Sequence, residues 1–208
     1  CTATSENWAA WGGGMQVAGG AATLTAVEVD GCVASSRLYQ ALGGGVQVEG
    51  GTLEMRGGGV RNCTATSELY SAYGGGVQMS GASYVVTLLD LAMRANVASS
   101  GGTALAVGAH ASAAFFSAAA LRIEPDCAAP PGTSLIHSAS PHFPLALRGL
   151  RVEGCAATSP IDATLLTCAE TFASSLYGER GACGLGAACV DVPVADGSPL
   201  TTPHCSCI

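Results

Sequence analysis

A repeat of 31 residues constrains the fold of this chain more than any other feature of its sequence. Three segments align without gaps, as CTATSENWAAWGGGMQVAGG from Cys1, CVASSRLYQALGGGVQVEGG from Cys32 and CTATSELYSAYGGGVQMSGA from Cys63. A fourth copy begins at Asn96 as NVASSGGTALAV and lacks the segment between VASS and the glycines. Fainter copies are marked by Cys127 and Cys155, so we expect about five to six units.

The composition of one unit predicts short strands rather than helices. Each unit carries a GGG triplet, which is a poor helix interior, and alternating runs such as VQV and TLTAVEV. Alternation between turn glycines predicts two or three short strands per unit. A single unit cannot bury its own hydrophobic face, so the units must stack. We therefore expect an all-β fold, a right-handed parallel β-helix (solenoid) over residues 1–160, with coils about 4.8 Å apart.

Stacking places residues of successive units above one another in columns. We expect two inward apolar columns, one amide column that hydrogen-bonds from coil to coil, and two charged columns. In that order, the columns are Val17, Val48 and Met79; Val29, Val60 and Met93; Gln16, Gln47 and Gln78; Glu6, Arg37 and Glu68; and Asp30, Arg61 and Arg94. The GGG triplets are interpreted as turns that need positive φ and close coil approach, because no GK[ST] follows them as a phosphate-binding loop requires.

The repeats resemble a known class of proteins. Units that begin with GG and end in Cys or Asn before an Ala-Ser/Thr stretch resemble right-handed β-helices of the pectin-lyase-like superfold. They are most similar to the repeats of polymorphic outer-membrane proteins and related surface proteins of microbes and algae. The resemblance implies the fold, but it implies little about activity, because many unrelated functions share this fold.

Residues 161–208 form a second, cysteine-rich unit. Its cysteines are Cys168, Cys183, Cys189, Cys205 and Cys207. The closing C-x-C pair, and the CVD after the third cysteine, resemble an EGF-like domain up to its fifth cysteine. The resemblance implies a truncated disulfide-rich module with the pairs Cys168–Cys189 and Cys183–Cys205, and it leaves Cys207 without its partner.

Metal binding by this module is the open alternative. Zinc is disfavoured because Cys183 and Cys189 are too widely spaced for a knuckle, although His204 lies beside two cysteines. Calcium binding at the EGF-like module is left open, because Asp162 and Asp191 supply only part of the acidic set that calcium-binding EGF modules carry. We expect no other cofactor.

Composition and cysteine content indicate the compartment and exclude some partners. The 10 cysteines favour a secreted or cell-surface protein, and the chain begins with Cys, which suggests an interior piece of a longer protein. All 8 basic residues are scattered arginines, so no basic face for nucleic acid is expected. The apolar segment 103–123 is too rich in alanine for a membrane span, so no membrane insertion is expected within the chain.

An aromatic column is the leading candidate for a ligand-binding site. It comprises Trp8, Tyr39 and Tyr70, with Trp11 and Tyr73 beside it. In one interpretation, the rings form a strip that binds glycans or extracellular proteins, because planar rings stack on the apolar faces of sugars. In the other, the rings stack on one another and shield the coil.

The sequence predicts no catalytic residue. Glu28 and the column of Asp30, Arg61 and Arg94 could form an acid–base group, but a stacked surface ion ladder is the simpler interpretation. The histidines, such as His137, are expected in loops or the core, and no G-x-S-x-G elbow is present. We therefore expect a non-catalytic structural or adhesive segment of a larger extracellular or cell-surface protein. The alternatives are a carbohydrate-active β-helix enzyme and a lectin-like module that uses the aromatic column.

Overall fold

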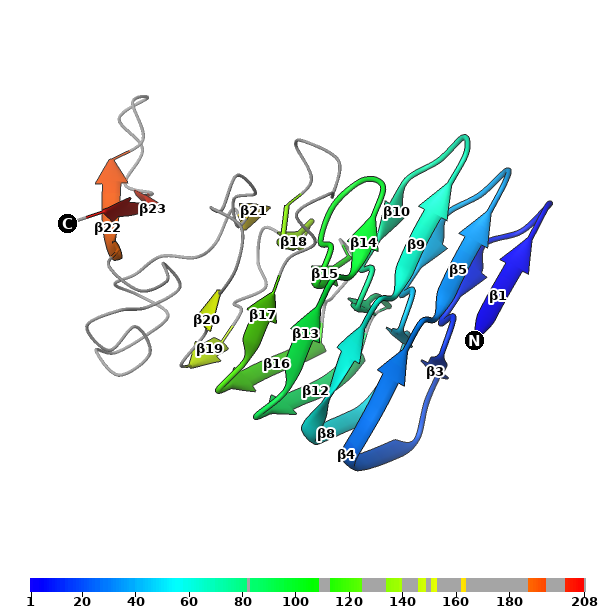
Figure 1. Cartoon of the computed structure of the whole chain (residues 1–208), viewed down its shortest axis with the longest axis horizontal. Helices are drawn as coiled ribbons and strands as arrows, with labels where there is room; N and C mark the ends of the chain where they lie inside the picture. The colour runs from blue at the N-terminus through cyan, green and yellow to red at the C-terminus, as the bar shows by residue number, and fades with distance from the viewer. Residues whose placement is uncertain are drawn as a thin grey trace.

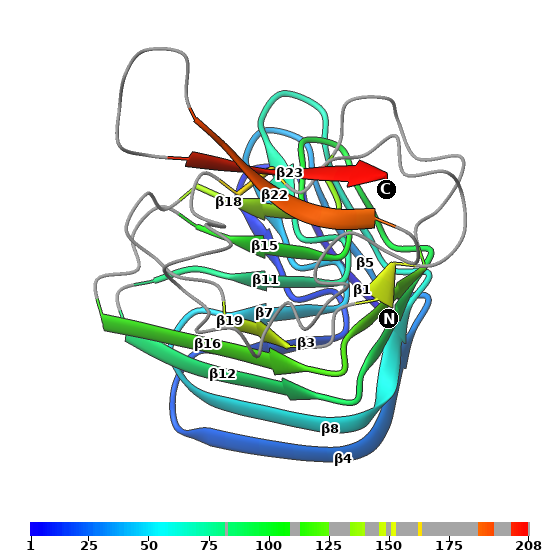
Figure 2. The ribbon, with the colours of Figure 1, turned by 90° about the vertical axis from the view of Figure 1, so that its left-hand side faces the viewer.

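Every regular element among the residues that the structure describes is a β-strand, and nearly all of these strands run parallel. The computed structural model describes residues 1–81, 83–108, 113–124, 134–139, 146–148, 151–152, 162–163, 187–193 and 201–207. Strands of successive coils lie side by side along the long axis (Figure 1), and they stack in layers when viewed along it (Figure 2). This arrangement confirms the all-β solenoid, a parallel β-helix.

Each of the first two coils contains four strands, more than the two or three predicted. The first coil has β1 (Thr2–Ser5), β2 (Ala10–Trp11), β3 (Met15–Val17) and β4 (Ala21–Asp30). The second has β5 (Val33–Ser36), β6 (Ala41–Leu42), β7 (Val46–Val48) and β8 (Gly51–Arg61). The prediction was too low because the GGG triplet separates a two-residue strand from the VQV strand, and a pattern of alternation does not detect so short an element.

The later coils vary this plan. The third coil has β9 (Thr64–Ser67), β10 (Ala72–Tyr73), β11 (Val77–Met79), β12 (Ser83–Leu89) and β13 (Ala92–Arg94). The fourth has β14 (Val97–Ala98), β15 (Leu105–Val107), β16 (Ala113–Ala119) and β17 (Arg122–Glu124). Onto these pair β18 (Ile136–Ser138), β19 (Ala146–Arg148) and β20 (Arg151–Val152), and β21 (Asp162–Ala163) pairs with β18.

The pairing register confirms that one sequence repeat corresponds to one coil of the solenoid. Gln47 lies between Gln16 and Gln78, and Val29 pairs with Val60, so the residues of the predicted columns do stack. In the fourth coil Val97 pairs with Thr64. The shortened segment that follows is confirmed as a missing loop, because the coil regains its place in the stack without it.

Two buried layers hold the coils together. The main one is a single apolar cluster that includes both predicted columns, with Val48, Val60 and Met79 fully buried. The second is a thin layer made only of alanine methyl groups, from Ala10, Ala34, Ala41, Ala65, Ala72 and Ala98. The alanine layer lets the sheet of β5 approach the sheet of β6 closely, and the loop between these two strands projects beyond it.

The GGG triplet serves the turn and the close approach that the sequence predicts. Gly43 has a φ of 67°, in the left-handed region that side chains rarely adopt. A Cβ atom on Gly44 would lie 2.5 Å from the backbone oxygens of both Gly75 and Thr64. The next coil therefore passes too close for any side chain at this position.

The corner before each cysteine or asparagine marker is also left-handed, and it does not depend on glycine. Gly31, Asn62 and Ala95 are equivalent residues, with φ values of 61°, 52° and 49°. Only the first is a glycine, so stacking on the neighbouring coil imposes the bend even where a side chain disfavours it.

The C-terminal strands β22 (Ala187–Pro193) and β23 (Thr201–Cys207) pair antiparallel, with Cys189 opposite Cys205. Cys168 and Cys183 lie outside the described residues, so both predicted disulfides stay predictions, as does calcium binding near Asp191. The segment 103–123 contributes strands rather than a helix. No helix in the described part of the chain is long and apolar enough to cross a membrane.

Candidate functional site

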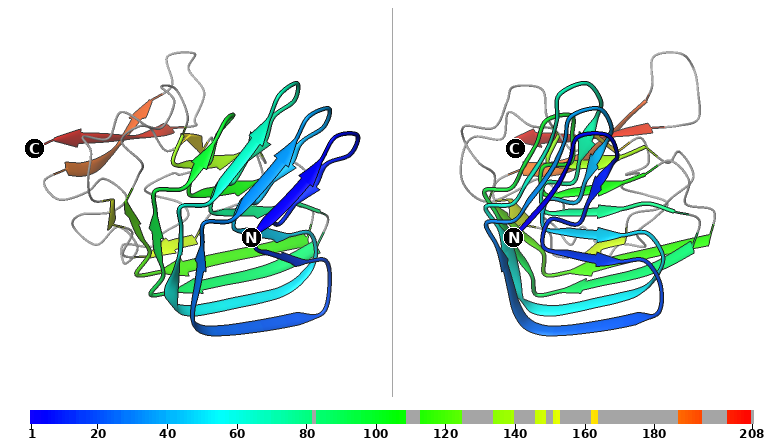
Figure 3. Two further views of the ribbon diagram at one scale, coloured as in Figure 1. Left: turned by 45° about the vertical axis from the view of Figure 1, so that its right-hand side comes forward. Right: turned by 90° about the vertical axis from the view of Figure 1, so that its right-hand side faces the viewer.

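Three rings of the predicted aromatic column form an exposed stack, here called the aromatic ladder: Trp8, Tyr39 and Tyr70. They lie in the loops after β1, β5 and β9, which project side by side beyond these strands (Figure 3). The centroids of Trp8 and Tyr39 are 6.2 Å apart with planes at 13°, and those of Tyr39 and Tyr70 are 6.0 Å apart at 7°. Their exposed fractions are 75%, 47% and 59%. The ladder is thus ordered and accessible at once.

A serine three residues before each ring positions the ladder. Ser36 Oγ accepts a hydrogen bond from the backbone N–H of Tyr39 at 3.1 Å and donates to the backbone oxygen of Trp8 at 2.8 Å. Ser67 repeats both contacts one coil later, with Tyr70 and Tyr39. Each hydroxyl therefore fixes its own loop and ties it to the loop of the preceding coil. The recurring serine in SENW, SRLY and SELY was the sequence signal for this role, which the sequence analysis overlooked.

The ring geometry favours a structural role over sugar stacking along the whole ladder. Because the planes are nearly parallel, each pair of rings covers part of the faces that a sugar would need. Among the described residues, the face of Tyr70 that is turned toward the fourth coil has no stacked ring, since that coil has no equivalent loop. The edges of all three rings remain open to a partner.

Trp11 and Tyr73, the other two candidates, sit in a second column beside the ladder. Parallel pairing of β2, β6 and β10 places Leu42 between them. Tyr73 stacks on His137, with ring centroids 5.0 Å apart and planes at 10°. His137 lies in β18, so it is a sheet residue rather than the loop histidine that was one of the two expectations. The sequence could not bring it to Tyr73, because the coil between them is shortened.

A polar depression of 340 Å³ lies at the base of the aromatic loops. Its lining residues are Thr4, Ser5, Glu6, Ser35, Ser36, Arg37 and Glu68. Arg37 Nε is 3.4 Å from Glu68 Oε2, so neighbouring coils attract each other at this charged column, as its alternating signs predict. Both side chains are largely exposed, and a pair of this kind contributes at most about 1 kcal/mol.

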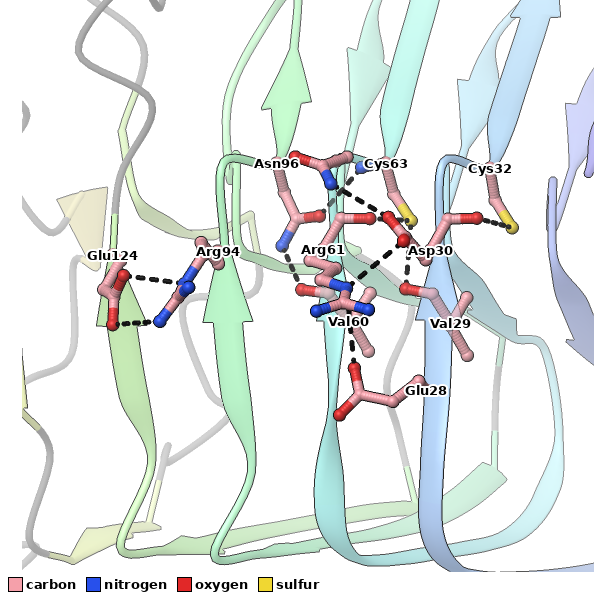
Figure 4. Close-up of polar contacts among 11 residues, drawn as sticks. Glu28, Val29, Asp30, Cys32, Val60, Arg61, Cys63, Arg94, Asn96 and Glu124 are labelled. Atoms are coloured by element: carbon pink, nitrogen blue, oxygen red, sulfur yellow. Dashed lines mark hydrogen bonds and ion pairs between the residues drawn. The ribbon is translucent and has the colours of Figure 1, made fainter.

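The charged column that could have been catalytic forms an ion ladder on the surface (Figure 4). Arg61 Nε is 3.2 Å from Asp30 Oδ2 and 3.7 Å from Glu28 Oε2. Arg94 contacts Glu124, with Nε 2.7 Å from Oε2. Read along the column, the charges run negative, positive, positive, negative, so each arginine pairs outward with an acid.

The electrostatic surroundings of Asp30 do not suit a general acid. A hydrogen bond from the Asn62 amide to Asp30, 2.9 Å long, and the Arg61 guanidinium hold the pKa of Asp30 below its usual value. A general acid needs a raised pKa, which burial or a like charge would supply. No group of three His, Cys, Asp or Glu side chains among the described residues could hold a metal ion.

The coil markers form a buried polar column beside the ion ladder (Figure 4). Cys32 and Cys63 are free thiols with almost no exposure, and Cys63 Sγ donates to the backbone oxygen of Arg61 at 3.1 Å. Asn96 takes the next position. Its Oδ1 accepts from the Cys63 backbone N–H at 3.0 Å, and its Nδ2 donates to the Val60 oxygen at 2.8 Å. Asn96 therefore satisfies two buried backbone groups at once.

Burial of Cys63 predicts a loss of stability at alkaline pH. Desolvation raises the pKa of its thiol from 9.0 to about 11. As the pH rises, the unfolded chain releases this proton first, so the free energy of unfolding falls between about pH 9 and pH 11, by at most about 2.7 kcal/mol. Burial also raises the pKa of Tyr84, which acts in the same direction. Urea unfolding across this pH range measures the slope.

A Cys63→Ala variant isolates the contribution of the thiol to this slope. It keeps Tyr84, so its stability should decline less steeply above pH 9 than that of the unmodified protein. Identical slopes for the two proteins would rule out the thiol as a source of the alkaline loss.

The amide column stacks as predicted, but its side chains do not bond to one another. Gln16 Nε2 donates to Glu49 Oε2 at 3.4 Å, and Gln47 Nε2 donates to Ser80 Oγ at 2.7 Å. In both cases the acceptor lies two residues beyond the glutamine of the next coil. The predicted amide-to-amide contact was wrong because the side chains reach diagonally across the sheet instead of along the column.

The chain matches no protein family, no curated protein and no solved structure.

Proposed function

We propose that this chain is a non-catalytic structural or adhesive segment of a larger extracellular or cell-surface protein. The observation that carries the proposal is the repetition of the same surface groups on successive coils, as in the aromatic ladder. Equivalent groups at regular spacing suit weak contacts that add up across many sites on a partner. Glycans or other extracellular proteins are the partners that such a surface fits.

The continuous bonding between coils supports a role as a stiff spacer. Backbone hydrogen bonds join the turns as well as the strands, for example from Gly44 N–H to the Gly74 oxygen at 2.9 Å. The main apolar cluster runs from Val17 in the first coil to Ile136 beyond the fourth. A segment held together in this way transmits force between its ends without bending at a linker.

The proposal extends to the family of the solenoid, the type of C-terminal module and the extracellular location. We propose that the solenoid belongs to the pectin-lyase-like superfold, with repeats of the polymorphic outer-membrane type, and that residues 161–208 form a truncated EGF-like module. The extracellular assignment depends on the C-terminal cysteines, because Cys32 and Cys63 are free thiols. Peptide mapping by mass spectrometry should find Cys168 linked to Cys189 and Cys183 linked to Cys205. Free thiols throughout this module would exclude both the EGF-like and the extracellular assignment.

The enzymatic alternative is tested by glycan depolymerisation. The purified chain should release no oligosaccharide from a panel of pectins and other acidic and neutral polysaccharides. A Glu28→Gln, Asp30→Asn double variant is the matched control, since it removes both acids that contact Arg61. Turnover by the unmodified chain that disappears in the double variant would replace the structural proposal with a carbohydrate-active enzyme.

The lectin-like alternative is favoured by one observation, the high exposure of the ladder rings. Glycan-array binding by the unmodified chain, compared with that of Tyr39→Ala and Tyr70→Ala, shows whether the ladder binds glycans or has only a structural role. Binding that both variants retain would exclude the ladder as the glycan site.

A further inference from the structure

We propose that a hollow between Tyr73 and Gln78 binds a single neutral sugar ring. The hollow has a volume of 220 Å³ and lies where the shortened fourth coil leaves space beside the third. Its lining residues are Gln40, Leu42, Tyr73, Gln78, Ser80, Gly81, Ala106, Val107, Gly108, His137 and Ala139. Binding there does not require the structural role proposed above, so the two proposals can fail separately.

The hollow exists because the fourth coil carries small residues where earlier coils carry large ones. Gly101 is the residue opposite Tyr73, and Ala106 is opposite Gln78. With no side chain at Gly101, the imidazole of His137 reaches past this coil and stacks on Tyr73. The stacked pair forms one wall of the hollow, and Ala106 leaves the space beside it open.

The Gln78 side chain lines this hollow, and its amide oxygen has no hydrogen-bond partner. Gln78 is 3% exposed. The glutamines of the two preceding coils donate through Nε2 to Glu49 and Ser80, two residues beyond the next glutamine position. For Gln78 the corresponding residue is Gly108, which has no side chain to accept. The Gln78 Nε2 group therefore lacks the side-chain acceptor that Gln47 has in Ser80, and a polar ligand in the hollow can supply one.

The chemistry of the lining selects a neutral polyhydroxylated ring. None of the described lining residues is a carboxylate, an ammonium or a guanidinium, so these residues supply no permanent charge to bind an ionic group. The hydroxyl groups of a sugar donate and accept, which matches the Gln78 amide and the hydroxyls of Ser80 and Tyr73. Sites for larger ligands measure roughly 300–1,000 Å³, so a 220 Å³ hollow accommodates one ring rather than an oligosaccharide.

Ligand-observed NMR on the full chain tests the inference. The probes are the methyl glycosides of glucose, galactose, mannose and N-acetylglucosamine, each at millimolar concentration. At least one glycoside should receive saturation transfer from the protein. No transfer to any of them would overturn the proposal and leave a hollow filled by water.

Two variants that copy residues of neighbouring coils locate the binding. Gly108→Ser restores the kind of acceptor that Ser80 gives Gln47, and Tyr73→Leu copies Leu42. Each should weaken binding about tenfold or more, because the first gives Gln78 Nε2 an acceptor within the protein and the second removes the ring wall. If Gly108→Ser fails to fold in a thermal unfolding control, Tyr73→Leu alone decides the outcome.

Gln16→Ala and Tyr39→Ala are the matched controls, since neither residue lines the hollow. Both should bind as the unmodified chain does. Binding that survives Tyr73→Leu, or that is lost in Tyr39→Ala alone, would place the site elsewhere and overturn the inference. Glycan turnover would instead overturn the non-catalytic proposal and leave the hollow untouched.

Discussion

Replacing Gly44 with alanine is expected to destabilise the solenoid by about 3 kcal/mol or more. The new Cβ atom would lie 2.5 Å from the Gly75 and Thr64 backbone oxygens, well inside contact distance. These atoms belong to the next coil and are fixed by its hydrogen bonds, so the two coils must separate locally. Urea or thermal unfolding followed by far-ultraviolet circular dichroism measures the loss.

Gly19→Ala is the control for this prediction. A Cβ atom at Gly19 would have no atom within 4 Å, and its φ is not in the left-handed region. Its free energy of unfolding should stay within about 0.5 kcal/mol of the unmodified value. Equal stability of the two variants would mean that the coils do not approach as closely as the structure places them.

Asn96→Ala is expected to cost about 2–5 kcal/mol of stability. The change leaves the Cys63 backbone N–H and the Val60 oxygen buried without partners, and each orphaned group costs about 1–3 kcal/mol. It also leaves a small cavity in the column of coil markers. Chemical denaturation gives the size of the loss.

The chain itself offers a graded comparison for Asn96. Asn96→Cys copies the residue found at Cys32 and Cys63, and its thiol can donate to the preceding backbone as Cys63 does to Arg61. It should therefore fall between the unmodified protein and Asn96→Ala. The exposed Asn7, changed to Ala, should have almost no effect. A loss at Asn7→Ala as large as at Asn96→Ala would contradict the argument from burial.

The architecture could be predicted from the sequence because the repeat has a fixed length. Once Gln16, Gln47 and Gln78 are placed on one column, the apolar columns and the aromatic ladder follow without knowledge of any side-chain conformation. The glycine turns were equally predictable, since Gly12, Gly43 and Gly74 recur at the same corner of successive coils and all have positive φ. Fixed spacing determines which residues are neighbours along the axis.

Contacts that run diagonally, or across a change in coil length, could not be predicted in this way. The Gln47 amide reaches Ser80 rather than Gln78, because a hydrogen bond follows side-chain direction and not sequence spacing. His137 meets Tyr73 only because the coil between them has lost a loop, which changes the spacing. The sequence shows which residues of the ion ladder are acidic and which are basic. Coordinates were needed to show that Arg61 pairs with Asp30 and that Arg94 pairs with Glu124.

Stacking makes the chain much shorter along the solenoid axis than the same residues are when they are extended. A coil of 31 residues adds about 4.8 Å along the axis when it is stacked, yet the same residues span roughly 100 Å when drawn out. Each coil is bonded mainly to its two neighbours, so we expect tension applied at one end to detach coils one at a time. Below the force that detaches a coil the stack transmits tension, and above it each detachment would lengthen the tether by about twenty times the height of the rung it removes, which limits the tension on the coils that remain.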